Sequence, residues 1–145
     1  MRVAVGSDHA GLTLKNALVE HLRAQGHEVD DVGTHDSRST DYPDYAAQVA
    51  QRVAGGRAER GLLVCGTGLG MAIAANKVRG VRAVTVSDTF SAHASREHND
   101  ANVLCLGERV VGGGLARDIL DTWMRASFEG GRHSGRLAKI TALED

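Results

Sequence analysis

Residues 61–76 read Gly61-Leu-Leu-Val-Cys65-Gly66-Thr67-Gly68-Leu69-Gly70-Met-Ala-Ile-Ala-Ala-Asn76, and none of them is charged. The apolar run that opens this stretch predicts a fully buried strand, and the helix formers at 71–77 predict a helix. A cysteine therefore ends a strand, and a glycine loop leads from it to a helix N-terminus. Free backbone N–H groups in such a place attract an anion and favour a thiolate. The plainer interpretation is a tight turn beside a small core cysteine; the three glycines favour the anion loop.

Strands and helices alternate along the rest of the chain. Apolar runs predict strands at 2–6, 28–32, 61–65, 81–87 and 103–106, with amphipathic helices between them. The alternation predicts an α/β fold: a single three-layer, doubly wound domain of the Rossmann-like or flavodoxin-like kind, residues 1–145, with about five parallel strands. A C-terminal helical tail is expected from about residue 130.

Folds of this kind bind ligands beyond the carboxyl ends of their strands, where the strand order reverses. Asp8 and His9 directly follow the first expected strand, and Cys65 ends the third. If the third strand lies beside the first, these residues face each other across the crevice. Asp8 has an equally good second interpretation as a helix cap.

Composition excludes several classes of function. The net charge of -1 over 145 residues gives no general attraction to nucleic acid or to an acidic membrane. The uncharged stretch is shorter than the ~20 residues that a membrane-spanning helix needs, and the N-terminus does not read as a signal peptide. The two cysteines, Cys65 and Cys105, do not suggest a disulfide framework. The sequence therefore predicts a cytoplasmic protein with neither a nucleic-acid nor a membrane partner.

Two cofactor classes find little support. The spacing Gly66-x-Gly68-x-Gly70 differs from the dinucleotide fingerprint G-x-G-x-x-G and lies on the third expected strand, although Asp88 could imitate the ribose-binding acid. No Gly-Lys-Ser/Thr follows the glycines, so a Walker loop is absent. The seven histidines form neither HExxH nor a pattern with paired CxxC motifs, so no metal site is expected.

Several polar groups outside the glycine loop have plain interpretations of their own. The sequence His98-Asn99-Asp100 suits a turn that ends a helix, and Cys105 lies inside an apolar run typical of core. The basic cluster of Arg132, His133 and Arg136 is by default a solvated face. Arginines at such places can also hold a phosphate, as can Arg109 after the fifth strand.

Taken together, the motifs resemble the type B ribose-5-phosphate isomerases, a family that shares its fold with the galactose-6-phosphate isomerase subunits. The resemblance runs in order from residue 3 to about residue 143. Members of the family have a cysteine or a glutamate as base, and Cys65, with Met71 where the acidic form has its glutamate, resembles the cysteine form. The motifs are Asp8-His9-Ala-Gly, Thr40-Asp41-Tyr42-Pro43, Cys65-Gly-Thr-Gly-Leu-Gly-Met, Ala75-Asn76-Lys77, His98-Asn99-Asp100, Gly107-x-Arg109 and Glu129-Gly-Gly-Arg132-His133-x-x-Arg136.

The resemblance implies an aldose–ketose isomerase that interconverts ribose 5-phosphate and ribulose 5-phosphate through a cis-enediolate, without cofactor or metal. It implies that Cys65 is the base and that His98 opens the sugar ring. Part of the phosphate site would come from a neighbouring subunit, so a homodimer is the minimum unit and a homotetramer the alternative. The remaining implied residues are Thr67 with Gly66, Gly68 and Gly70 for the oxyanion; Asp8, Tyr42 and Asn99 for the sugar; and His9, Arg109, Arg132 and Arg136 for the phosphate.

Two alternatives stay open at this point. The substrate could be a six-carbon aldose phosphate, such as allose or galactose 6-phosphate. The protein could also be a non-catalytic module that binds a phosphosugar or a nucleotide, against which the intact pair of Cys65 and His98 argues.

Overall fold

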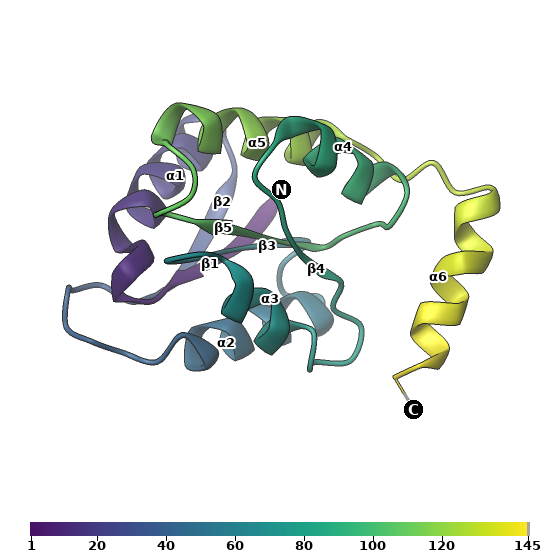
Figure 1. The fold of residues 1–145 in the computed structure, drawn as a ribbon, viewed down its shortest axis with the longest axis horizontal. Helices are drawn as coiled ribbons and strands as arrows, with labels where there is room; N and C mark the ends of the chain where they lie inside the picture. Colours follow the sequence, from purple (N-terminus) through teal and green to yellow (C-terminus); the bar gives the residue numbers. More distant parts are fainter. Residues whose placement is uncertain (145) are drawn as a thin grey trace.

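The computed structural model describes residues 1–144, and these form one five-stranded sheet with the strand order β2-β1-β3-β5-β4 (Figure 1). Every neighbouring pair of strands is parallel. The predicted α/β class and parallel sheet are confirmed. The strands are β1 (Arg2–Ser7), β2 (Glu28–Gly33), β3 (Arg60–Cys65), β4 (Ala83–Thr85) and β5 (Val103–Gly107).

Helices cover both faces of the sheet. Figure 1 shows α1, α4 and α5 on one face, α2 and α3 on the other, and α6 to one side of the sheet. Within residues 1–144, no helix is both long and apolar enough to cross a membrane. The helices are α1 (Leu12–Ala24), preceded by a 3₁₀ turn (His9–Gly11), α2 (Tyr42–Ala54), α3 (Leu69–Ala75), α4 (Thr89–Glu97), α5 (Gly113–Arg125) and α6 (Arg132–Ala142).

The central strands β1, β3 and β5 send their side chains alternately into two cores, because successive residues of a strand point to opposite faces. Val3 and Val5 of β1 belong to the core beneath α1, α4 and α5. Ala4 belongs to the core beneath α2 and α3, as do Leu63 and Cys65 of β3. The Cys65 thiol therefore leaves the sheet on the side where the glycine loop turns into α3.

The structure corrects the expected fourth strand, which spans only Ala83–Thr85 instead of 81–87. This strand lies at the edge of the sheet, and Asn76 occupies part of its free side. The Asn76 side-chain nitrogen donates to the Ala83 carbonyl at 2.9 Å, and its oxygen accepts the Ala83 N–H at 2.8 Å. The helix expected over 71–77 likewise ends at Ala75, with Asn76 as its C-cap.

Candidate active site

A cavity of about 400 Å³ opens at the carboxyl edge of the sheet, between the ends of β1 and β3. The strand order reverses at this point, because β1 pairs with β2 on one side and with β3 on the other. The structure thus brings Asp8 and His9 opposite Cys65, as the sequence predicts for neighbouring strands. The cavity is lined by Asp8, His9, Ala10, Tyr42, Cys65, Gly66, Thr67, Gly70 and Arg109.

Cys65 is the last residue of β3, and its side chain is buried at the base of this cavity. The Gly68 N–H donates to the Cys65 Sγ at 3.1 Å, an interaction that a thiolate accepts more strongly than a thiol. Gly68 has a left-handed backbone with φ of 78°, and a Cβ there would lie 2.9 Å from the Leu106 carbonyl carbon. Glycine is therefore needed at 68 to aim a backbone N–H at the sulfur.

Asp8 caps the turn that follows β1. Its Oδ1 accepts the N–H groups of Ala10 and Gly11 at 3.0 and 3.1 Å, and the side chain is buried. The capping interpretation of Asp8 is thus confirmed, and the same residue also lines the cavity. Capping fixes the direction in which the chain leaves β1, and with it the place of His9.

A backbone contact that the sequence gave no reason to expect orients the exposed His9 ring. The Thr40 N–H donates to His9 Nδ1 at 3.1 Å, across 31 residues of sequence. Because Nδ1 accepts, it carries no proton, and Nε2 is left as the nitrogen that can donate. A contact between a side chain and a distant backbone group has no local sequence signal.

Tyr42 and Arg109 form the sides of the cavity. A Cβ on Gly70 would lie 2.5 Å from the Tyr42 ring, so the tyrosine packs directly on the glycine loop. The Arg109 N–H donates to the Gly66 carbonyl at 3.1 Å, which places the exposed guanidinium side chain beside the loop. Thr67 is exposed on the loop, and its hydroxyl oxygen accepts the Leu69 N–H at 3.3 Å.

His98 and Asn99 lie toward the amino ends of the strands, whereas the Cys65 of the same chain lies at the carboxyl ends. The turn that contains them is fixed by the Asn102 carbonyl, which accepts the Gly61 N–H at 2.9 Å. Gly61 precedes Cys65 by four residues of β3, about 13 Å along an extended strand. The sequence contained a signal for this separation. Residues between a helix and the next parallel strand lie at the amino ends of the strands, and His98 and Asn99 are in such a segment.

The expected phosphate ligands Arg132 and Arg136 lie one turn apart on α6 and are both exposed. Figure 1 shows α6 on the side of the molecule away from the loop 34–41, whose Thr40 N–H donates to His9 of the cavity lining. One chain therefore carries two separate groups of predicted site residues. His9, Tyr42 and Arg109 accompany Cys65, whereas the α6 arginines accompany His98.

His133 links the second group by stacking on His98. The ring centroids are 4.5 Å apart and the planes are inclined by 17°. Burial, together with the charge of Arg132, lowers the pKa of His133 and so favours the neutral ring. The stack joins the end of α4 to the start of α6, and the Glu129 N–H supports the junction by donating to the Glu97 carbonyl at 3.0 Å.

His98, Glu129 and His133 bring their ligand atoms within 4.8 Å of one another, which raises the question of a metal. An imidazole nitrogen binds a metal in the plane of its ring at about 2.0–2.1 Å. Two stacked, nearly parallel rings cannot place one ion in both planes at that distance. The residues therefore fit a bound metal poorly.

Cys105 has the core position that its apolar run predicts. It is fully buried in the middle of β5, in the same core as Cys65. Desolvation, followed by the nearby Cys65, raises the pKa of the Cys105 thiol well above its ordinary value. Both cysteines are free thiols, and only Cys65 borders the cavity.

Comparison with known proteins decides the family. The family model described as Ribose/Galactose Isomerase matches residues 3–140 of the chain. The chain belongs to this family. It is 54% identical over 143 residues to ribose-5-phosphate isomerase B of Escherichia coli K12, with 99% of this chain and 96% of that protein covered. It is also 41% identical over 145 residues to D-erythrulose-4-phosphate isomerase of Pectobacterium atrosepticum, with 99% and 95% covered.

Solved structures of the family superimpose on nearly the whole chain. Ribose-5-phosphate isomerase B of Clostridium thermocellum has a TM-score of 0.99 and 53% identity, with 99% of this chain and 97% of that chain covered. The Mycoplasma genitalium enzyme with bound ribulose-5-phosphate has a TM-score of 0.96 and 43% identity, with 99% and 95% covered. The predicted resemblance to type B ribose-5-phosphate isomerases is thereby confirmed.

Proposed function

We propose that this protein interconverts ribose 5-phosphate and ribulose 5-phosphate, with Cys65 as the base. The observation that carries the proposal is the Cys65 thiol at the base of a polar cavity, with a backbone N–H 3.1 Å from its sulfur. The names of the family members support the reaction and the five-carbon substrate. The bound ribulose-5-phosphate in the Mycoplasma genitalium structure supports a phosphosugar as ligand.

The reaction requires one proton to move between adjacent carbons. In the open-chain aldose, the Cys65 thiolate takes the proton from C2. The electron pair of that C–H bond forms the C1–C2 double bond, and the carbonyl π pair moves onto O1 to give an enediolate. The thiol then returns the proton to C1 while the O2 hydroxyl proton passes to O1, which leaves a ketone at C2 and a hydroxyl at C1. A general base in this position typically contributes about 10²- to 10⁴-fold to the rate.

The negative charge of the enediolate needs hydrogen-bond donors beside the sulfur. The loop Gly66–Gly70 offers backbone N–H groups and the Thr67 hydroxyl around the same cavity. One donor aimed at a developing oxyanion contributes about 3–4 kcal/mol. Asp8 and Tyr42 would contact the sugar hydroxyls, and His9 with Arg109 would bind part of the phosphate.

The remaining predicted roles call for a second subunit. The turn with His98 and Asn99 leads into Asn102, which meets Gly61 near the amino end of β3, whereas Cys65 ends the same strand about 13 Å further along. We therefore propose a homodimer in which the region 130–145 and the His98 turn of one chain complete the cavity of the other. His98 would open the furanose ring there, and Arg132 and Arg136 would bind the phosphate. A homotetramer of two such dimers is the alternative.

The proposed chemistry is independent of metals and nucleotides, and exhaustive chelation is expected to leave the rate of isomerisation unchanged. Loss of activity on chelation that a divalent ion restores would contradict the proton-transfer mechanism. Two free thiols, one of which must stay reduced to act, suit a reducing compartment such as the cytoplasm.

Substrate size is the point on which the family itself divides. The Pectobacterium atrosepticum relative is named for a four-carbon phosphate, which makes such a substrate the second candidate beside the six-carbon ones. The decisive experiment is a panel of four-, five- and six-carbon aldose phosphates assayed for ketose formation. The highest kcat/KM is expected for ribose 5-phosphate; a higher value for another length reassigns the substrate, and no turnover on the whole panel refutes the enzyme assignment.

A further inference from the structure

The turn that carries His98 and Asn99 ends on a residue with an unusual backbone. Asp100 has φ of 46°, and among the non-glycine residues of 1–144 it alone has a positive φ. Its N–H donates to the Arg96 carbonyl at 3.2 Å, and the next N–H, that of Ala101, donates to the Ser95 carbonyl at 2.9 Å. The turn is thus wound back onto the end of α4. Aspartate is one of the few residue types that tolerate this conformation.

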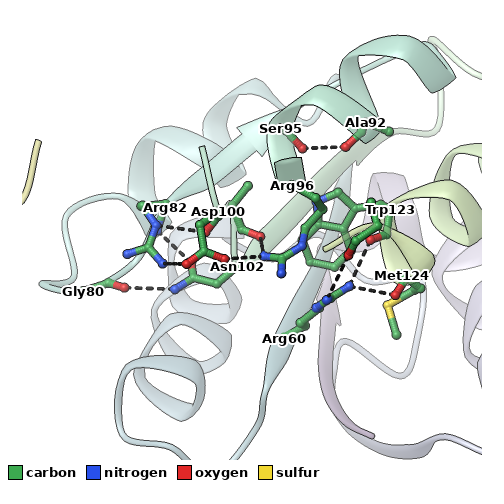
Figure 2. A network of polar contacts seen from close by, with 12 residues as sticks. Arg60, Gly80, Arg82, Ala92, Ser95, Arg96, Asp100, Asn102, Trp123 and Met124 are labelled. Carbon is green, nitrogen blue, oxygen red and sulfur yellow. Dashed lines mark hydrogen bonds and ion pairs between the residues drawn. The ribbon is translucent and has the colours of Figure 1, made fainter. Parts of the chain in front are cut away.

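Arg82 and Arg96 form ion pairs with the Asp100 side chain from opposite sides (Figure 2). One carboxylate oxygen lies 3.0 Å from an Arg96 guanidinium nitrogen, and the other lies 3.3 Å from an Arg82 guanidinium nitrogen. Arg82 also donates to the Asp100 carbonyl at 2.9 Å, so it holds both the backbone and the side chain of this residue. The Asp100 carboxylate therefore ties the turn to α4 on one side and to the approach to β4 on the other.

Each arginine is itself anchored. Arg96 is buried, donates to the Ala101 carbonyl at 2.6 Å and lies over the Trp123 ring at 5.8 Å. The Arg82 N–H donates to the Asn102 side-chain oxygen at 2.7 Å. Because Arg96 belongs to α4 and Arg82 directly precedes β4, Asp100 is held between two elements of the fold rather than on a free surface loop.

The charge of Asp100 balances a crowded group of cations. Arg60 also stacks on Trp123, at 5.2 Å from the ring on which Arg96 lies. Burial and the charge of Arg96 lower the pKa of Arg60 to about 10, while Asp100 acts in the opposite direction. A neutral residue at 100 would remove the carboxylate that pairs with Arg82 and Arg96.

We infer that the Asp100 carboxylate fixes the turn that presents His98 to the substrate, which makes Asp100 a positioning residue for ring opening. The inference rests on the ring-opening role proposed for His98. In this role the Asp100 carboxylate, which contacts Arg82 and Arg96, acts by keeping His98 and Asn99 at the end of α4 in one orientation. A displacement of about 1 Å in a catalytic group is enough to cost on the order of 100-fold in rate.

The test compares two activities of the same enzyme. Conversion of ribose 5-phosphate needs ring opening and proton transfer. Exchange of the C1 hydrogen of ribulose 5-phosphate with D₂O needs proton transfer alone, because the phosphate on O5 prevents this ketose from closing a furanose ring. His98→Asn serves as the benchmark for a ring-opening defect, and Cys65→Ser for a proton-transfer defect.

Two substitutions remove the charge and keep the backbone. Asp100→Asn and Asp100→Gly both tolerate positive φ, so neither strains the turn. We expect ribose 5-phosphate conversion to fall about 10- to 100-fold in both, with C1 exchange retained to within about threefold of wild type. Asp118→Asn, the same chemical change at an exposed position of α5, should leave both activities unchanged.

Other patterns overturn the inference. Unchanged conversion shows that the turn holds without the carboxylate, and loss of both activities together shows that Asp100 supports the fold or the subunit contact as a whole. If His98→Asn itself loses exchange and conversion in equal measure, the ring-opening role of His98 fails first. That result is distinguishable because it appears in the benchmark and not only in the Asp100 variants.

Discussion

Cys65 and Cys105 lie on neighbouring strands and in the same core, yet only one of them is placed for chemistry. Cys65 ends β3 beside the cavity and accepts the Gly68 N–H, whereas Cys105 is enclosed in the middle of β5. Cys65→Ser keeps the shape of the side chain and replaces the thiol with a hydroxyl that is too weakly acidic to act as the base. We expect kcat for ribose 5-phosphate to fall about 10²- to 10⁴-fold, as measured by ketose formation under saturating substrate.

The matched control for this variant is Cys105→Ala. It removes one sulfur from a core strand, so it should lower the free energy of unfolding modestly and leave kcat near that of wild type. Binding of a substrate analogue to Cys65→Ser should change little, because the proposed sugar and phosphate contacts lie on other residues. Near wild-type turnover by Cys65→Ser would rule out the cysteine as base.

Helix α6 is the element whose role depends most on what lies outside the chain. It lies to one side of the sheet and presents Arg132 and Arg136 on exposed positions one turn apart. If these arginines bind the phosphate, Arg136→Ala should raise KM about tenfold or more, because a charge-assisted hydrogen bond contributes about 1.5–3 kcal/mol. Steady-state kinetics on ribose 5-phosphate measure this directly.

Lys139 provides the control on the same helix, because it is also an exposed cation. Lys139→Ala should leave KM unchanged. Equal effects of the two substitutions would indicate a general electrostatic attraction. A wild-type KM in Arg136→Ala would mean that the basic face of α6 is simply solvated.

At the scale of the whole molecule, the separation of His98 from its own Cys65 predicts complementation between inactive chains. Cys65→Ala protomers lack the base and His98→Asn protomers lack the ring-opening group, yet a mixed dimer contains one site in which both are intact. With random pairing at equal amounts, half of the dimers are mixed and each has one working site, so about a quarter of the wild-type activity should return. Assays before and after exchange of subunits measure the gain.

Formation of mixed dimers must be verified independently, for example with a tag on one variant. Verified mixed dimers without recovered activity would show that each chain builds its site alone. The same outcome would contradict the assignment of the α6 arginines to a partner subunit.

Local sequence determined the layered arrangement of helices on a parallel sheet and the glycine loop at the centre of the candidate site. Alternating apolar runs and amphipathic helices specify a parallel sheet, and Cys65 before three glycines specifies a thiol at the end of a strand. Such features depend on residues close together in the chain, so they can be read without coordinates. The boundaries of β4 and α3 could not, because they involve tertiary contacts such as the hydrogen bonds between the Asn76 side chain and Ala83.

Tertiary structure alone decided which of the predicted residues share a cavity. Thr40 orients His9 from 31 residues away, and Asp100 meets Arg82 across 18 residues. Such pairs form only after the helices have packed on the sheet, so no spacing or periodicity in the sequence encodes them. The same packing places Cys65 at the carboxyl ends of the strands and His98 toward their amino ends. Each helix returns the chain to the amino end of the sheet before the next parallel strand begins.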